Sequence, residues 1–253
     1  MASAEQDTEE ALDAFQLFMR NRVAPNPSLR NPQFSRDVNY ADRIEAQCQE
    51  DNHRTWGFVI YRTTYESDAD WEEVICRIRA HTQGTMDMFN GQDVLDRMTW
   101  TIFDDRSLFD DVPTATIRKH FKEWCEGAVL AEQGITDPGK SSRYRYCLQV
   151  DYEAMRSILQ APTPPDYVPG DPGWLKLIVK DWLPFDENPR LAAARAPTYQ
   201  RDTTVYEPIE GMTERHVGFV RCTITSVMLN IYIVFCDPTN FSVWERRPPD
   251  LVG

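Results

Sequence analysis

The spacing of apolar residues changes along the chain, and each spacing predicts one kind of element. Stretches rich in β-branched and aromatic residues, with apolar and polar positions alternating, are typical of strands. Apolar residues that recur every three or four positions indicate helices between these stretches. The segment 227–235 is apolar throughout, which fits either a buried helix or a buried strand. The strands are expected at 56–63, 98–103, 144–150, 174–182 and 217–225.

Particular residues mark where the helices begin and end. The segment 67–70 offers the side-chain oxygens of Ser67, Asp68 and Asp70 as N-caps before one apolar helical stripe, and Asp151 offers one before another. Asp110 or Asp111 is expected to do the same for the middle helix, which Gly134 ends. The connections are too irregular for a doubly wound sheet. We therefore expect an α+β fold with a mainly antiparallel sheet and helices on one face, ferredoxin-like in character.

The chain is expected to divide near residue 54. Residues 1–22 carry apolar positions at helical spacing, and 23–54 hold three prolines and a long polar stretch. We interpret 1–54 as an N-terminal helix followed by an irregular lead-in, and 55–253 as a single α+β domain. A long proline-rich loop is expected at 184–212, and loops of that length are more often functional than neutral.

Charge narrows the classes of partner. The chain has 253 residues, of which 40 are acidic and 27 basic, which gives a net charge of −13. Such a negative body repels nucleic acid and anionic membranes, and no apolar run reaches the roughly 18 residues of a membrane span. The sequence is acidic from Glu5 onward, whereas a secretory signal begins with basic residues. We therefore expect a cytoplasmic protein, with no nucleic acid and no membrane among its partners.

No motif points to a cofactor or a metal ion. Residues 134–141 match the phosphate-loop pattern G-x-x-x-x-G-K-[ST], which needs a strand before it and a helix after it. Here a predicted helix ends at Gly134 and a predicted strand follows, so we interpret the match as a plain connecting loop. The four histidines are far apart, and the acidic doublets lack the alternating ligands of a calcium loop. We expect no cofactor and no metal, and the six dispersed cysteines are interpreted as structural thiols.

Alternation within three of the strands indicates a ligand site. In each strand one face is largely aliphatic, and the other collects cations and aromatic residues. The aliphatic faces should meet the helices, and the mixed faces should share one surface. Guanidinium and ammonium groups beside indole rings can hold a carboxylate or phosphate and stack on a planar ring. The candidate ligand-binding residues are Arg143, Arg145, Lys176, Lys180, Arg221, Trp174 and Tyr61.

Two functions remain open at this stage. The cations would be structural if they pair with acids of the lead-in and of the 184–212 loop, or stay solvated. Because no catalytic signature is present, we favour a non-catalytic binding or interaction protein, whose partner is a small anionic ligand or another protein. The alternative is an enzyme acting on a small anionic metabolite, with Tyr61 or Tyr146 transferring a proton. A deep cavity over the mixed face, roofed by 184–212, would support a ligand site, and a filled face would support the interaction hypothesis.

Four segments carry a resemblance to other proteins. Residues 56–62, 143–147, 206–211 and 244–249 read WGFVIYR, RYRYC, YEPIEG and WERRPP. In these segments the chain resembles a group of uncharacterised proteins of filamentous fungi, and the likeness covers about residues 55–250. The resemblance implies a fungal cytosolic setting and nothing about chemistry. In such a setting, the alternative function is that of an enzyme of fungal secondary metabolism. No activity is established for that group, so the resemblance assigns no functional residue.

Overall fold

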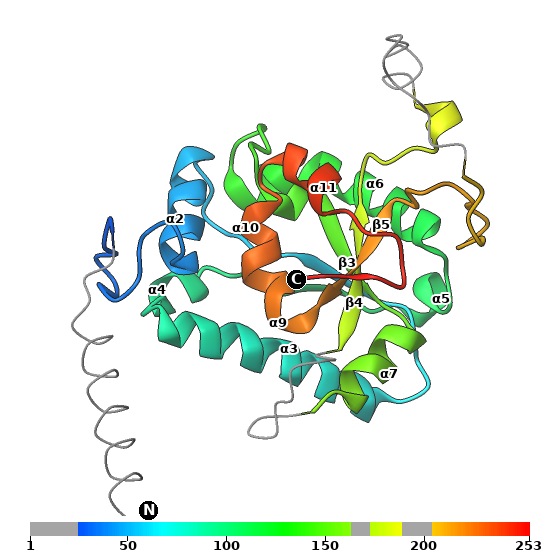
Figure 1. Ribbon diagram of the computed structural model, residues 1–253, viewed down its shortest axis with the longest axis horizontal. Coiled ribbons are helices and arrows are strands. Elements are labelled where there is room, and N and C mark those ends of the chain that lie inside the picture. The colour runs from blue at the N-terminus through cyan, green and yellow to red at the C-terminus, as the bar shows by residue number, and fades with distance from the viewer. Residues whose placement is uncertain (1–24, 163–172, 189–203) are drawn as a thin grey trace, which may run out of the picture.

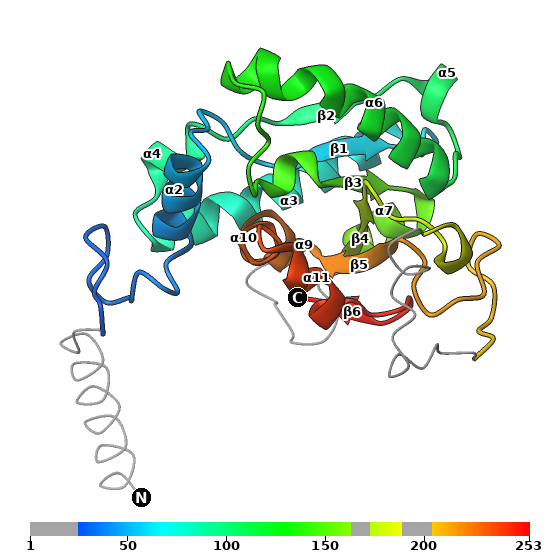
Figure 2. The same ribbon diagram turned by 90° about the horizontal axis from the view of Figure 1, so that it is seen from above.

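The described part of the chain is built around one six-stranded sheet. The computed structural model describes residues 25–162, 173–188 and 204–253, so the helix predicted for 1–22 lies outside the described residues. The strands follow the order β2-β1-β3-β4-β5-β6, which runs from top to bottom in Figure 2. Their bounds are β1 (Val59–Arg62), β2 (Thr101–Phe103), β3 (Tyr146–Val150), β4 (Trp174–Val179), β5 (Phe219–Thr223) and β6 (Leu251–Val252).

The sheet contains both parallel and antiparallel pairs. β1 runs parallel to β2 and β3, β4 is antiparallel to both of its neighbours, and β6 is parallel to β5. The α+β class is confirmed, the prediction of a mainly antiparallel sheet was wrong, and a ferredoxin-like character is not confirmed. Parallel neighbours need a long crossover connection, and two long helices supply it. These are α3 (Asp68–Met88), between β1 and β2, and α6 (Thr114–Gln133), between β2 and β3.

The first face of the sheet packs against α3, α7 (Tyr152–Gln160) and a series of three short helices. Leu148, Leu177 and Val220 occupy register positions on neighbouring strands and are fully buried on this face. The apolar run 227–235 is therefore helical, because it covers the sheet and does not extend it. The three helices are α9 (Ile224–Ser226), the π-helical segment η3 (Val227–Ile231) and α10 (Tyr232–Val234).

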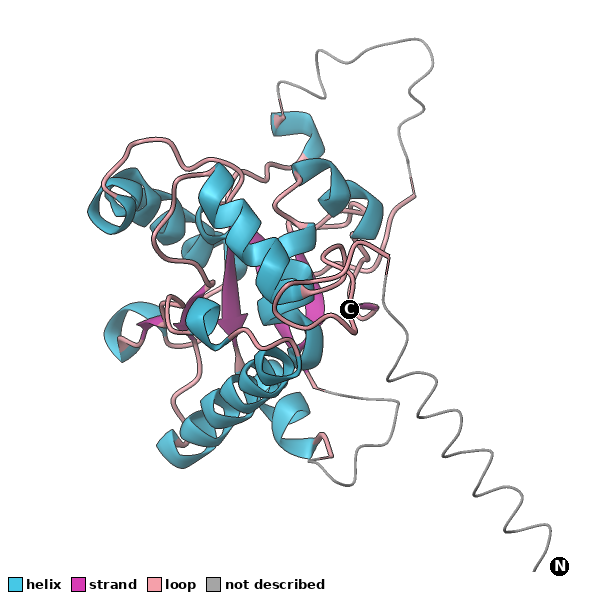
Figure 3. Ribbon diagram, turned by 90° about the vertical axis from the view of Figure 1, so that its left-hand side faces the viewer, coloured by secondary structure: helices cyan, strands magenta, loops and turns pink. Residues whose placement is uncertain are grey.

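The second face of the sheet packs against α6. Ile117 and Phe121 of this helix share a buried cluster with Cys147, Ile178 and Phe219 of the sheet. The prediction that helices cover only one face was wrong, because the apolar stripe of α6 needs a surface of its own. Figure 1 shows α3 and α6 on opposite sides of the strands, and Figure 3 shows the strands enclosed among helices.

The lead-in contains a regular helix that the sequence interpretation missed. α2 (Tyr40–Glu50) begins after Asn39, whose side chain accepts a hydrogen bond from the backbone N–H of Asp42. Its buried residues follow helical spacing and pack into the main core: Ala41, Ile44 and Cys48. The expectation of a mostly irregular 23–54 was therefore wrong for this stretch. Its polar composition hid a narrow apolar stripe.

Helix ends follow the expected caps in three of four cases. Ser67 caps α3, Asp151 caps α7, and Gly134 ends α6 in the left-handed conformation with φ of +74°. Neither Asp110 nor Asp111 caps α6. The N-cap position is held by a proline, and the free N–H of Thr114 donates instead to the carboxylate of Glu210, across 2.9 Å. A residue almost a hundred positions away thus replaces the local cap.

The remaining helices are short. η1 includes Tyr144, so the strand predicted at 144–150 begins only at Tyr146. None of the described helices is both long and apolar enough to cross a membrane. The bounds are α4 (Gln92–Leu95), α5 (Arg106–Phe109), η1 (Ser142–Tyr144), η2 (Phe185–Glu187) and α11 (Pro238–Trp244).

Candidate functional site

Two of the predicted cations lie side by side on the second face of the sheet. Lys176 of β4 is the register partner of Arg221 of β5, and Gln149 of β3 is the next position in the row. The alternation predicted from the sequence is confirmed at these positions. The Arg221 guanidinium lies 3.8 Å from the centre of the Trp174 ring. The strands therefore bring together Lys176, Arg221 and Trp174.

Both of these cations already have carboxylate partners. The Nζ of Lys176 is 2.9 Å from a carboxylate oxygen of Asp151 and 3.0 Å from one of Glu210. Burial lowers the pKa of Lys176, but the two carboxylates outweigh burial and hold this pKa above its ordinary value. Arg221 donates to Glu153 across 2.8 Å. These pairs agree with the hypothesis that the cations are structural and bind acids of the protein itself. One of these acids, Glu210, comes from the long proline-rich loop.

A cavity of about 600 Å³ lies over this row, and we call it the sheet-face cavity. Residues 207–210 of the long loop line it, so it lies where the sequence placed a roofed site. Five acids and three cations line it, and its two sheet cations are neutralised. It therefore offers an anion little attraction. The charged lining residues are Asp111, Asp151, Glu153, Glu207, Glu210, Lys176, Arg221 and Arg247.

Arg143 lies inside the protein and not on the mixed face. Its side chain is fully buried, and its Nε and Nη2 donate to the carboxylate of Glu132 across 2.7 Å and 2.6 Å. The other N–H groups donate to Gly57, Thr99 and Thr101, so all five donors are used within the protein. Alternation fails here because Arg143 belongs to the 3₁₀ helix η1 and not to a strand. Arg143 is left with no donor for a ligand.

Arg145 and Tyr61 are also distant from the row. Arg145 donates to the backbone oxygens of Gly139 and Cys236, on the loops around η1 and α11. Tyr61 is fully buried on β1, and its hydroxyl lies 2.8 Å from Nδ1 of His120. Burial raises the pKa of Tyr61 far above its ordinary value, so its hydroxyl stays protonated. Neither residue contributes to the sheet-face cavity.

Lys180, the last of the candidates, lines a different cavity of about 700 Å³ between α6 and the end of β4. We call it the α6–β4 cavity. Four cations face two carboxylates in its lining, and the rest is mainly apolar. The sequence predicted this combination, an excess of cations beside apolar side chains, for the face of the sheet. The lining residues are Ala115, Arg118, Lys119, Lys122, Lys180, Asp181, Trp182, Leu183, Pro184, Glu187, Asn188 and Met212.

Arg118 is fixed in place at the base of this cavity. Its Nε donates to the backbone oxygen of Val179 across 2.9 Å, and its Nη2 donates to that of Gly218 across 3.1 Å. Its guanidinium lies 4.9 Å from the centre of the Trp182 ring. Across the described ranges Arg118 forms no ion pair. Burial lowers its pKa below the ordinary value, and the charge of Glu210 offsets this only in part.

Gly218 makes this arrangement possible. Its φ is +78°, a backbone conformation that residues with a Cβ atom rarely adopt. A Cβ at this position would lie 2.5 Å from Nη2 of Arg118 and 2.5 Å from the ring of Trp182. Only glycine therefore lets the strand backbone accept the hydrogen bond from Arg118 while the indole packs against it.

The three lysines of the cavity are held loosely. The Nζ atoms of Lys122 and Lys180 lie 3.9 Å and 3.6 Å from carboxylate oxygens of the same exposed residue, Asp181. Lys119 is exposed and has no ion-pair partner within the described residues. Weak surface pairs of this kind contribute little to stability and leave the ammonium groups free to meet a ligand. The cavity is therefore positive on an acidic protein.

Sequence reasoning missed most of this site. It singled out only Lys180, and it did not include Arg118, Lys119 or Lys122. The only signal in the sequence that could have found them is the presence of three cations within five residues of one predicted helix. Trp182 is the last residue of the strand predicted at 174–182 and was not included among the candidates.

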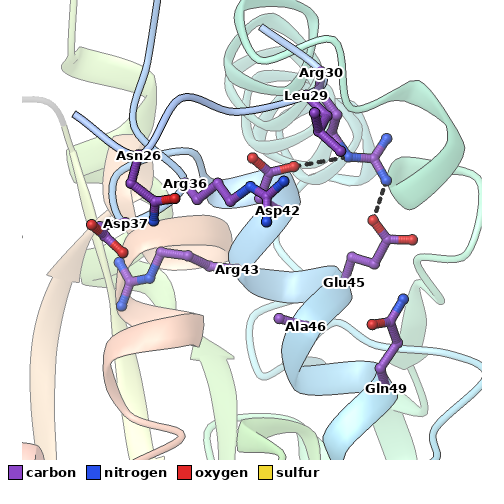
Figure 4. A pocket seen from close by; sticks show the side chains of 10 residues that line it. All are labelled: Asn26, Leu29, Arg30, Arg36, Asp37, Asp42, Arg43, Glu45, Ala46 and Gln49. Atoms are coloured by element: carbon purple, nitrogen blue, oxygen red, sulfur yellow. Dashed lines mark hydrogen bonds and ion pairs between the residues drawn. The ribbon is translucent and has the colours of Figure 1, made fainter. Parts of the chain in front are cut away.

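A further cavity, of about 940 Å³, lies beside α2 and has no excess charge. Figure 4 shows Arg30 directed at Asp42 and Glu45, and it also pairs with Asp93. Three arginines and three acids line this cavity, so its charges balance. It therefore gives no indication of the charge of a ligand. The charged lining residues are Arg30, Arg36, Arg43, Asp37, Asp42 and Glu45.

The match to the phosphate-loop pattern is a connection between α6 and η1, as the sequence analysis expected. The backbone N–H of Lys140 donates to the carboxylate of Asp51, and that of Gly139 donates to Asp137, each across 2.9 Å. The Nζ of Lys140 pairs with Glu50 across 2.6 Å. The donors that a phosphate would need are therefore engaged by carboxylates of the protein itself. Elsewhere in the described chain, no group of three or more potential ligands is placed to hold a metal ion.

Comparisons with known protein families, with curated proteins and with solved structures gave no match. The resemblance to the fungal group therefore stays a prediction. The geometry of the cavities is the basis on which function can be argued.

Proposed function

We propose that the protein is a non-catalytic binding protein that holds an anionic ligand in the α6–β4 cavity. The observation that carries this proposal is the state of Arg118, a partly buried guanidinium that forms no ion pair with any described residue. A partly buried charge without a counter-ion is only incompletely solvated, and such groups concentrate at functional sites. An anion in the cavity would supply the missing charge.

The residues around Arg118 also favour a ligand that is negatively charged and has a planar or apolar part. Lys119, Lys122 and Lys180 add positive charge around the opening, and Trp182 offers a planar ring beside the guanidinium of Arg118. Cations at a partly enclosed cavity focus the field and attract a small anion even when the whole protein is negative. The net charge of −13 would at the same time repel large polyanions. A small anion with an apolar or planar part fits best.

Binding is favoured over catalysis because the proton-transfer candidates are elsewhere. Tyr61 is buried against His120, and burial raises the pKa of Tyr146 to about 12. Neither tyrosine lines the α6–β4 cavity. The cavity instead combines fixed cations with apolar side chains, which orient a ligand without changing it. The cytoplasm stays the proposed setting.

The test compares a charged and an uncharged fluorescent probe. 1-Anilinonaphthalene-8-sulfonate is a planar anion, and N-phenyl-1-naphthylamine is its uncharged counterpart. We expect the double variant Lys119→Ala with Lys122→Ala to weaken binding of the sulfonate by about tenfold, at roughly 0.7 kcal/mol per ion pair, and to leave the amine unchanged. Lys140→Ala is the matched control, because this exposed lysine pairs with Glu50 outside the cavity.

The proposal is wrong if the double variant binds the sulfonate as tightly as the native protein. It is also wrong if the Lys140→Ala control loses as much affinity as the double variant, because the attraction would then come from surface charge in general. Native mass spectrometry of the protein from its host adds a second measurement. A retained small molecule should carry an acidic group and should be lost in the double variant.

A further inference from the structure

The flank of α6 that lines the α6–β4 cavity continues into a smaller cavity of about 310 Å³. Lys180 lines both cavities, so they adjoin at this side chain. We call the second one the small cavity. The residues of its lining that matter below are Cys125, Glu126, Val129, Leu130, Pro138 and Lys180.

One stripe of the helix faces both cavities. Arg118 and Lys122 line the first, and Glu126, Val129 and Leu130 line the second. Arg118, Lys122 and Glu126 are four residues apart, and Val129 and Leu130 lie three and four residues after Glu126, which is the spacing of neighbours along one side of a helix. At 1.5 Å per residue, the stripe from Arg118 to Val129 is about 16 Å long. The two cavities therefore form one elongated groove along α6.

The two ends of the groove differ in character. The cations lie in the first half of α6, from Arg118 to Lys122. The other end presents Leu130 and Pro138, with the nearly buried Val129 at its border, and Leu130 is 57% exposed although it is apolar. Burial raises the pKa of the Cys125 thiol to about 12, so it is uncharged at neutral pH. Glu126 would repel a second negative charge at this end.

We infer that the ligand is an elongated amphiphile with a single terminal carboxylate. The carboxylate lies among Arg118, Lys119 and Lys122, the chain passes Lys180, and the apolar part covers Leu130 and Pro138. This inference rests on the proposed function, because it assigns a ligand class to the same site. It adds that affinity comes from apolar contact in the small cavity as well as from charge.

The experiment measures how well decanoate and acetate displace 1-anilinonaphthalene-8-sulfonate from the full-length protein. We expect decanoate to bind at least about 100-fold more tightly than acetate, because several methylene groups leave water. Leu130→Gln should weaken decanoate about fivefold and leave acetate unchanged. Leu108→Gln on α5 is the matched control, since Leu108 is 56% exposed, nearly the same as Leu130, and lies outside the groove.

Three results would overturn the inference. The first is equal displacement by decanoate and acetate, and the second is an equal effect of Leu130→Gln and Leu108→Gln on decanoate. The third is equal displacement by decanoate and by the uncharged decanol, which would remove the role of the carboxylate. Each of these leaves the proposed function intact if the sulfonate still depends on Lys119 and Lys122. Failure of the lysine test itself would instead refute the proposed function.

Discussion

The ion pair between Glu132 and Arg143 gives the sharpest prediction about stability. Arg143 is fully buried, and three of its five hydrogen bonds go to groups other than Glu132. The substitution Glu132→Gln keeps the volume and removes the charge. It leaves the guanidinium in the core without a counter-ion, because no other ion pair of Arg143 lies within the described residues.

The expected loss follows from the burial of the two partners. Breaking a buried pair on one side costs about 3–5 kcal/mol. The side chain of Glu132 is 21% exposed, so we take the lower end and expect about 3 kcal/mol. The double variant Glu132→Gln with Arg143→Met removes both charges, and its loss should be at least about 1.5 kcal/mol smaller than the sum of the single losses.

Urea unfolding followed by tryptophan fluorescence measures these free energies. Equal slopes of the unfolding free energy against urea in all variants would show that the unfolded states are comparable. A loss below about 1 kcal/mol for Glu132→Gln would refute the reasoning, because it would mean that the pair is effectively solvated. Losses that simply add in the double variant would refute it as well.

The pH dependence of the same pair has a definite sign. Arg143 holds the pKa of Glu132 below its ordinary value of 4.5, although burial acts to raise it. A carboxylate with a lowered pKa in the folded state stabilises above its ordinary pKa and loses that contribution as the pH falls through the folded value. The difference in unfolding free energy between the native protein and Glu132→Gln should therefore shrink below about pH 4.

Three further predictions concern other contacts. Glu210→Gln removes the carboxylate that caps α6 and pairs with Lys176. Urea unfolding should therefore show that the free energy of unfolding falls by about 2 kcal/mol. The exposed control Glu207→Gln should lower it by less than about 0.5 kcal/mol. Gly218→Ala forces a Cβ into the arginine and the indole beside it, so it should lower the Tm and weaken sulfonate binding, and an unchanged Tm would contradict this. The hydrogen bond to Glu245 raises the pKa of His216. The protonated imidazole therefore contributes fully to the free energy of unfolding below about pH 6.5, and this contribution is lost as the pH rises through the pKa of the folded state. His216→Gln should remove this pH dependence, and an unchanged pH profile of unfolding would contradict the prediction.

Local pattern was sufficient where neighbouring residues alone decide the outcome. Ser67 and Asp151 cap helices because a side-chain oxygen lies within one turn of a free N–H. Lys176 and Arg221 share a face because alternation within a strand depends only on the extended backbone. The helix caps and the shared face of the two cations were therefore predicted correctly from the sequence.

Long-range packing decided the rest. Arg143 lies outside β3 because the residues just before this strand form a 3₁₀ turn. The turn places the guanidinium beside Glu132 of α6. The cation site depends on the end of β4 meeting the middle of α6, and the positions of Arg118 and Trp182 in the sequence give no sign of that meeting. Strand direction likewise depends on which elements cross over, so the parallel pairs could not be read from strand composition.

The outermost strands of the sheet have a consequence for self-association. β2 has three residues and β6 has two, so each border of the sheet exposes few unpaired backbone groups. Long, flat borders invite another molecule to add its own strand, which is a common route to aggregates. We expect borders this short to keep the protein dispersed at concentrations at which a sheet with long open borders would begin to assemble into fibres.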